Sequence, residues 1–266
     1  MHRTDPDKEK KIYVIGYPKS GNTWFTRMVS GVLNARVVTT KRAHSGDERT
    51  TFTDEWKIIK AHTENRNFAV NNISETDKVF YVVRDFRDVL VSGFFFSHRK
   101  IRERSAKNGK SLRFFVVRLY FLYYLKKNII SWQGNPIRRR IKRSLRRNNK
   151  SAEVGNWSEH VKWGLSLPNC VLVKFEELLL DCFATMKKAL DEAGLIYSEE
   201  KLHEVVSAES FHTKKRTFEK NNDIDNLQFM RKGVSGDWQK FLPKKYLRII
   251  YARHGAMLEK MLYVDK

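Results

Sequence analysis

The sequence predicts an α/β fold of three layers, in which helices flank a central, mostly parallel β-sheet. Three observations support this prediction. Short apolar runs rich in β-branched residues recur along the chain, stretches of helical character separate them, and the first run leads into the glycine-bounded loop GYPKSG. The 266 residues, 41% of them hydrophobic, are enough for one large core, so we expect a single domain over 1–266.

Four segments are predicted to be strands. Residues 11–17 form the apolar run that ends at the loop, and 56–62 (WKIIKAH) form the second candidate. Residues 78–83 (KVFYVV) and 170–175 (CVLVKF) are short, β-branched and apolar enough to be covered on both faces. Strands covered on both faces are typical of parallel sheets.

Helices are predicted after the loop, after the strand at 78–83 and near the end of the chain. One helix should occupy 22–33, directly after the loop. Another should begin with Asp85 as its N-cap and Asp88 in its first turn, and run toward Ser97. Pro243 should open a helix near the end of the chain, because proline fits the start of a helix.

The loop after the first strand has the composition of an anion-binding loop. The nucleotide P-loop reads G-x-x-x-x-G-K-S/T, and Gly16, Gly21 and Thr23 fall at matching positions, which makes the predicted fold P-loop-like. Position 22 is Asn22, and the lysine stands inside the loop as Lys19. Such a loop points several backbone N–H groups and a helix N-terminus at one place. We therefore expect an anion there.

Four anion-binding segments follow one another along the chain: YPKSGNTW from Tyr17, KAH at 60–62, RDFRDVLVS from Arg84 and RKGVSGDW from Arg231. Together they resemble the sulfotransferases that use 3′-phosphoadenosine 5′-phosphosulfate (PAPS), in the cytosolic type and its bacterial relatives. The resemblance covers nearly the whole chain and is weakest across 97–155. It implies an enzyme that moves a sulfuryl group from PAPS to a hydroxyl, in preference to an amine, and releases adenosine 3′,5′-bisphosphate (PAP).

PAPS has a 5′-phosphosulfate and a separate 3′-phosphate, so the resemblance implies two anion sites. The residues that it implies for the 5′ end and the adenine are Lys19, Ser20, Gly21, Asn22, Thr23 and Trp24. Those that it implies for the 3′-phosphate are Arg84, Ser92, Arg231, Lys232 and Gly233. Phe218 matches the aromatic residue that faces the adenine. Phe175 stands where relatives commonly have a tyrosine before an acidic pair, so a stacking face is kept while the phenolic hydroxyl is lost.

Lys60 and His62 are two residues apart at the end of a predicted strand, so their side chains should project from the same face. In the family the matching histidine is the general base, and its ordinary pKa near 6.5 leaves it largely neutral at physiological pH. Sulfuryl transfer should resemble phosphoryl transfer, with a loose in-line transition state and charge on the leaving oxygen. Lys19 is implied to neutralise that charge, with Lys60 as a second cation. No metal ion is expected.

Residues 97–152 are predicted to form a basic, partly apolar helical insert. Between 99 and 150 there are eighteen lysines and arginines and one acidic residue, which gives +17 of the net charge of +22. Residues 112–125 are too short to span a bilayer, which needs about 20 apolar residues. Residues 135–147 place a narrow apolar stripe opposite a basic face, as interfacial helices on anionic lipid do.

Two interpretations of the insert remain open. It binds an anionic membrane surface, which would suit a lipid, a glycan or another membrane-associated acceptor, or it forms a wall of the acceptor pocket followed by a solvated helix. The first eleven residues contain no apolar stretch, and this predicts neither a secretory signal nor an N-terminal anchor. The expected location is the cytoplasm, with peripheral attachment to the inner face of a membrane if the insert binds lipid.

Two rival functions fit parts of the sequence. A P-loop kinase would use Asp85, directly after its strand, as a magnesium ligand, but Asn22 and the second anion site at Arg231 disfavour it. A non-catalytic protein that binds membranes or nucleic acid has only the charge of 99–150 in its favour. Nucleic acid is therefore not an expected partner.

Overall fold

The computed structural model describes residues 10–39, 53–62, 73–97, 157–223 and 233–263. Their contacts form two compact units. The first, here called the sheet unit, covers 1–83 and 154–214, and the second, the helical unit, covers 84–153 and 215–266. A single domain over 1–266 stays a prediction. The insert lies outside the described residues except for Ser97 at its edge, and so do both interpretations of it.

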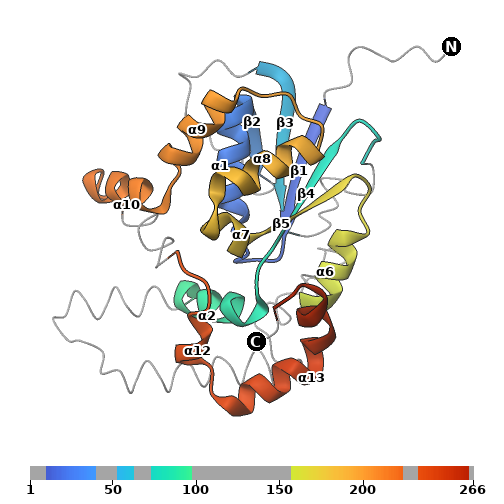
Figure 1. The fold of residues 1–266 in the computed structure, drawn as a ribbon, viewed down its shortest axis with the longest axis vertical. Helices are drawn as coiled ribbons and strands as arrows, with labels where there is room; N and C mark the ends of the chain where they lie inside the picture. Colours follow the sequence, from blue (N-terminus) through green and yellow to red (C-terminus); the bar gives the residue numbers. More distant parts are fainter. Residues whose placement is uncertain (1–9, 40–52, 63–72, 98–156, 224–232, 264–266) are drawn as a thin grey trace, which may run out of the picture. The chain divides into compact units, whose positions relative to one another are not determined.

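The sheet unit contains five parallel strands in the order β2-β3-β1-β4-β5 (Figure 1). The strands are β1 (Lys10–Gly16), β2 (Ala35–Thr39), β3 (Thr53–Ala61), β4 (Lys78–Val83) and β5 (Cys170–Lys174). The central, all-parallel sheet confirms the predicted fold class. Because β1 is the middle strand, the loop that follows it opens at the carboxyl edge of the sheet with β3 and β4 on either side.

The predicted strands agree with the observed ones to within a few residues. β4 has the predicted bounds, while β3 begins three residues before the predicted 56–62. β5 ends at Lys174 because Phe175 is already the first residue of α7. β2 was not predicted, since it is only five residues long and directly follows Asn34, whose left-handed φ of 49° ends the preceding helix.

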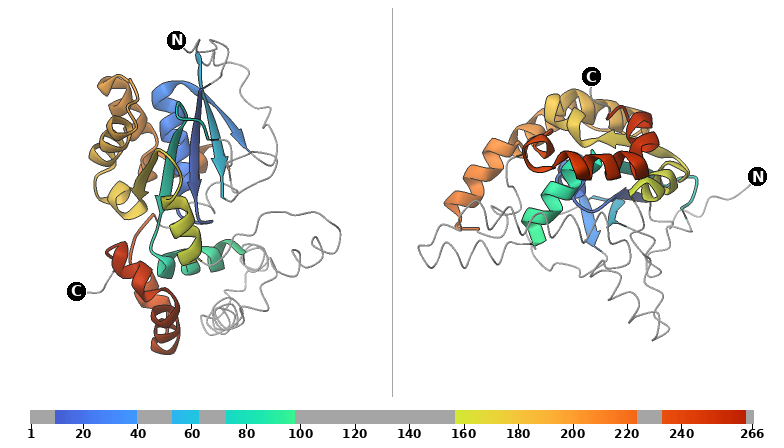
Figure 2. Two further views of the ribbon diagram at one scale, coloured as in Figure 1. Left: turned by 90° about the vertical axis from the view of Figure 1, so that its right-hand side faces the viewer. Right: turned by 90° about the horizontal axis from the view of Figure 1, so that it is seen from below.

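One face of the sheet is covered by helices of the sheet unit, as the left view of Figure 2 shows for α8 and α9. These helices are α1 (Asn22–Leu33), α7 (Phe175–Leu180), α8 (Cys182–Glu192) and α9 (Glu199–Ala208). Their core side chains, among them Phe25, Met28 and Leu190, are fully buried against strand residues such as Val14 and Phe80. Successive side chains of a strand point to opposite faces of the sheet, so each strand also presents apolar residues to the other face.

The opposite face receives α6 (Trp157–Leu165), which packs against β1, β4 and β5. Trp157 and Val161 are buried there. Gly164 allows the close approach, because a Cβ atom at this position would lie 2.0 Å from Cε2 of Tyr81. α6 therefore packs directly on the Tyr81 ring of β4.

The described part of the helical unit contains α2 (Phe86–Ser97), α12 (Trp238–Phe241), α13 (Lys244–Lys260) and the second half of α10 (Phe211–Lys220). Pro243 is the N-cap of α13, which confirms the predicted opening of that helix. α2 packs on α12, where the rings of Phe95 and Phe241 meet edge to face at 5.2 Å. In the part of the chain that the structure describes, no helix is both long and apolar enough to cross a membrane.

Replacing glycine by alanine should have opposite effects on stability at two positions, because Gly164 is crowded by Tyr81 and Gly255 is not. Gly164→Ala should lower the free energy of unfolding by about 1–3 kcal/mol, because the new methyl group overlaps the Tyr81 ring. Gly255→Ala in α13 is the matched control, since no atom beyond the adjoining backbone of its own helix lies within 4 Å of its Cβ position, and it should gain about 0.5–1 kcal/mol. Urea unfolding followed by circular dichroism measures both. A Gly164→Ala protein as stable as the wild type would contradict this packing.

Candidate active site

The loop between β1 and α1 has an unusual backbone. Lys19 has a φ of 76° and Gly21 a φ of 102°. The left-handed region is costly for a lysine, and residues held in it are concentrated at functional sites. When left-handed and right-handed backbone conformations alternate along a loop, successive N–H groups point into one concavity that suits an anion. α1 begins at Asn22 without a side-chain cap and without an acidic residue in its first turn, so its own N–H groups add to this concavity.

Ser20 lies at the centre of the loop with an exposed fraction of 0%. Its backbone N–H donates to the carbonyl of Tyr17 at 3.1 Å, but its buried hydroxyl has no hydrogen-bond partner among the described residues. Burying a hydroxyl without a partner costs free energy. An oxygen of a bound phosphate or sulfate would accept this hydrogen bond, so the loop fits the anion that the sequence predicts.

Asn22 occupies the position of the P-loop lysine, and its side chain turns into the protein. It is 2% exposed, and its amide nitrogen donates to the carbonyls of Gly16 at 3.2 Å and Ala61 at 3.3 Å. Gly16 must lack a side chain, because a Cβ atom there would lie 2.5 Å from the amide oxygen of Asn22. Asn22 thus joins the ends of β1 and β3.

Lys60 and Thr23, both assigned to the predicted site, contact each other. The ammonium of Lys60 donates to the hydroxyl of Thr23 at 2.6 Å. Burial lowers the pKa of Lys60, and the nearby charge of Arg27 lowers it further. A partly buried cation with a lowered pKa is stabilised when a negative charge binds beside it.

His62 directly follows β3, and its ring lies against the loop. Nδ1 is 2.9 Å from the carbonyl oxygen of Gly16 and 3.4 Å from the amide nitrogen of Asn22. A carbonyl oxygen can only accept, so the shorter contact requires a proton on Nδ1. In the neutral ring this leaves Nε2 as the basic nitrogen.

Two aromatic residues flank the loop. The indole N–H of Trp24 donates to the carbonyl of Glu209 at 2.9 Å, and its ring meets Phe175 edge to face at 6.0 Å. Phe175 also packs on the loop itself, because a Cβ atom at Gly21 would lie 2.5 Å from its ring. The Phe175 ring therefore contacts both the loop and Trp24.

The residues predicted for the 3′-phosphate belong to the helical unit. Arg84 is 8% exposed and donates to the carbonyl of Val234 at 3.1 Å, next to Gly233 with its φ of 62°. Ser92 lies on α2. Arg231 and Lys232 lie outside the described residues. Phe218 lies on α10 with an exposed fraction of 9%, the burial of a packed core side chain, and its contact with adenine stays a prediction.

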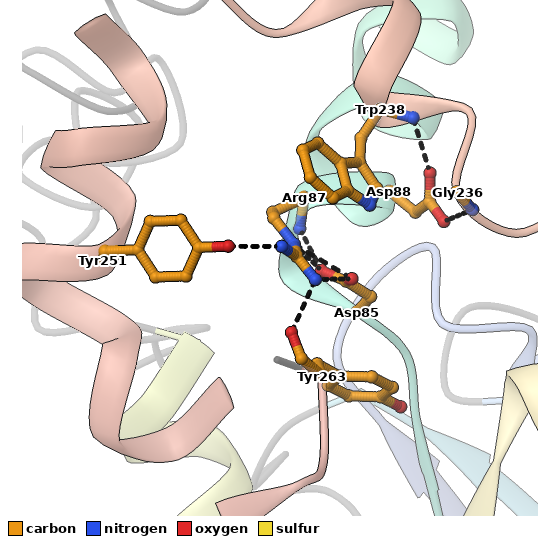
Figure 3. Close-up of polar contacts among 7 residues, drawn as sticks. All are labelled: Asp85, Arg87, Asp88, Gly236, Trp238, Tyr251 and Tyr263. Atoms are coloured by element: carbon orange, nitrogen blue, oxygen red, sulfur yellow. Dashed lines mark hydrogen bonds and ion pairs between the residues drawn. The ribbon is translucent and has the colours of Figure 1, made fainter. Parts of the chain in front are cut away.

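A buried arginine that the sequence interpretation passed over organises the helical unit (Figure 3). Arg87 is 3% exposed and holds both carboxylate oxygens of Asp85 at 2.7–3.0 Å. It also donates to the hydroxyl of Tyr251 and to the carbonyl of Tyr263, each at 2.6 Å, and stacks 4.0 Å from the Trp238 ring centre. Two arginines and two aspartates within five residues of an otherwise apolar segment were the available sign of buried ion pairing.

The same pair bears on the kinase alternative. Asp85 was the residue that a kinase would need as a magnesium ligand, but its carboxylate is already engaged by the fork of a guanidinium. The structure thus removes the main support for that alternative. Within the described ranges, no group of three or more histidine, cysteine, aspartate or glutamate residues is arranged to hold a metal ion.

Asp88 holds the segment after Gly233. Its carboxylate, 1% exposed, accepts from the backbone N–H groups of Gly236 at 2.7 Å and Trp238 at 3.0 Å (Figure 3). From the sequence, Asp88 was only a first-turn residue of α2. The structure shows that it ties α2 to the start of α12, and so fixes the end of the RKGVSGDW segment.

Asp88→Asn should lower the free energy of unfolding by about 1–3 kcal/mol, because one acceptor oxygen becomes an amide that faces a backbone N–H. Asp191→Asn is the matched control: its carboxylate also accepts a hydrogen bond, from Tyr197, but at the surface, and the loss should stay below about 0.5 kcal/mol. Urea denaturation separates the two. Equal losses for both variants would mean that the buried carboxylate does not hold the segment.

Comparison with known proteins identifies the family. The model of the sulfotransferase domain matches residues 9–261. Sulfotransferase 2A6 of Mus musculus is 27% identical over 261 residues, covering 90% of this chain and 81% of the relative. The 3-beta-hydroxysteroid sulfotransferase of Cavia porcellus is 26% identical over 256 residues, covering 87% and 78%.

Solved structures agree with these relatives in fold. Mouse sulfotransferase SULT7A1 complexed with PAP has a TM-score of 0.57 at 20% identity and covers 93% of this chain and 85% of its own. Retinol dehydratase in complex with androsterone and the inactive cofactor PAP has a TM-score of 0.57 at 18% identity, covering 95% and 82%. The match of the family model over nearly the whole chain confirms the resemblance seen in the sequence: the chain belongs to the sulfotransferase domain family.

Proposed function

We propose that this sulfotransferase moves a sulfuryl group from PAPS to a hydroxyl of its acceptor, with His62 as the general base. The observation that carries the proposal is the contact between Nδ1 of His62 and the Gly16 carbonyl: in a neutral ring it calls for a proton on Nδ1, which leaves Nε2 as the basic nitrogen next to the loop. The PAP in the solved structures of similar fold supports PAPS as the donor.

The loop holds the 5′ end of PAPS. Backbone N–H groups from Lys19 to Thr23 and the unpartnered hydroxyl of Ser20 bind its oxygens. Trp24 and Phe175 lie at the side of the loop, and their rings border the adenine of PAPS. In the helical unit, Arg84, Ser92 and Gly233, with Arg231 and Lys232, bind the 3′-phosphate.

PAPS supplies the sulfuryl group and a phosphate as the leaving group. Nε2 of His62 takes the proton of the acceptor hydroxyl as its oxygen bonds to sulfur, and the bond from sulfur to the 5′-phosphate oxygen breaks in line. The charge that develops on the leaving oxygen is stabilised by Lys19 and the loop N–H groups, with Lys60 beside them. The products are a sulfate ester and PAP.

The acceptor is a hydroxyl compound. The names of two similar proteins include a hydroxysteroid and androsterone, and both are apolar alcohols. For this chain a lipid, a glycan or a small aromatic alcohol would each use the same base and donor. The direct test is a transfer screen with labelled PAPS against lipid, saccharide and phenol pools, read by mass spectrometry. Labelled sulfate esters are expected; no ester from any pool, together with no binding of PAPS or PAP, would overturn the proposal.

His62→Ala and Lys19→Ala should both lower transfer to a small residual rate, for different reasons. Loss of a general base costs about 100- to 10,000-fold in kcat but removes no contact with the nucleotide. His62→Ala should therefore keep the wild-type affinity for PAP, whereas Lys19→Ala should weaken it. Isothermal titration with PAP makes the comparison, and an equal loss of affinity in both variants would refute these two roles.

Arg231→Ala should remove the preference for PAP over adenosine 5′-monophosphate, because only PAP has a 3′-phosphate for the second anion site. Titrating both nucleotides into the variant and the wild type gives the ratio of affinities. Arg216→Ala, at an exposed arginine of α10, is the control and should leave that ratio unchanged. A preference that survives Arg231→Ala would place the 3′-phosphate elsewhere.

A further inference from the structure

His160 on α6 is a buried histidine that the proposed reaction does not use. It is 5% exposed, and both of its ring nitrogens have partners within the sheet unit. Nδ1 lies 2.7 Å from the hydroxyl of Tyr81 on β4, and Nε2 lies 2.5 Å from the backbone carbonyl oxygen of His62. A residue 98 positions away in sequence thus contacts the backbone of the proposed base.

The partners determine where each proton lies. The carbonyl oxygen of His62 can only accept, so Nε2 of His160 must donate to it. If the ring is neutral, Nδ1 then has a lone pair, and Tyr81 must donate its hydroxyl proton to it. The hydrogen bonds run in one direction, from Tyr81 through His160 to His62.

The surroundings keep the ring neutral. Tyr17 meets the His160 ring edge to face at 5.4 Å, and Trp163 does so at 5.2 Å. Burial among these rings lowers the pKa of His160 to about 4, and burial also raises the pKa of Tyr81 well above its ordinary value. Neither group ionises at neutral pH, so the order of protons is fixed.

His62 needs such a contact because it lies one residue beyond the end of β3, where the strand ladder no longer holds its backbone. Its ring is attached to the Gly16 carbonyl through Nδ1, and its own carbonyl is attached to His160. A catalytic group that is held both at its ring and at its backbone keeps one orientation.

We propose that Tyr81 and His160 form a positioning pair, which fixes the backbone of His62 and thereby the direction in which Nε2 of the base points. The pair touches neither donor nor acceptor in this role and acts through His62. α6 presents His160, and Gly164 on the same helix seats that helix on the Tyr81 ring. The inference rests on the proposed function of His62 as base.

A spectroscopic test addresses the geometry without any turnover. In the full chain labelled with 15N-histidine, at neutral pH, His160 should be neutral with its proton on Nε2, and His62 neutral with its proton on Nδ1; His160→Gln and His62→Gln assign the two signals. His160→Leu should turn the His62 signal into a mixture of both tautomers. A proton on Nδ1 of His160, or a His62 signal that is unchanged in His160→Leu, would overturn the proposal.

A kinetic test addresses the role, with PAPS and 1-naphthol as substrates. His160→Leu should lower kcat by about 10- to 100-fold, as removal of orienting groups does, with the affinity for PAP unchanged within about twofold. His160→Gln keeps an N–H donor toward the His62 carbonyl and should recover most of the rate. His203→Leu, at an exposed histidine stacked on Phe183, is the matched control and should have no effect.

The decisive comparison is made in the His62→Ala background. A pair that acts only through His62 has nothing left to position there, so His160→Leu should cause no further loss. A further loss would show that His160 acts on a substrate directly and would overturn the proposal. If His62→Ala retains full activity, the proposed base is wrong; if only His160→Leu retains it, the base stands and the positioning pair is wrong.

Discussion

One amide holds the proposed active site together. The side chain of Asn22 donates to the last carbonyl of β1, at Gly16, and to the last carbonyl of β3, at Ala61. The anion-binding loop starts from the first strand and His62 follows the second, so the distance between donor site and base depends on this bridge. In a nucleotide P-loop this position is a lysine that reaches the phosphates. Here the lysine stands three residues earlier, as Lys19, and position 22 serves the scaffold instead.

In the helical unit, buried charged side chains hold the elements together. Arg87 connects the start of α2 to α13 and to the last described residue, Tyr263, while Asp88 holds the start of α12. Each of these groups is buried with its hydrogen bonds made, which is the condition under which a buried charge is tolerated. The segment that includes Gly233 is thus fixed at its far end by a carboxylate, and near Val234 by Arg84.

The features that could be predicted from the sequence are those that depend on neighbouring residues. Apolar runs placed four of the five strands, and glycine spacing placed the loop that contains Lys19. The positive φ of Lys19 was not predicted. The roles of Asn22, Arg87 and His160 were missed because they depend on contacts across 39, 176 and 98 residues, which no local pattern contains. In α6 a sign was available: His160 lies one turn from Trp157 and Gly164 on the apolar face, where a histidine needs a polar partner.

The central claim is that this chain binds the nucleotide of a sulfuryl donor in preference to a nucleoside triphosphate. Thermal unfolding of the wild-type chain, with PAP or with ATP and magnesium at equal concentration, tests it most directly. The account predicts that PAP raises the midpoint by several degrees and that ATP with magnesium leaves it nearly unchanged. A larger rise with ATP and magnesium than with PAP would contradict the assignment of this loop to a sulfuryl donor.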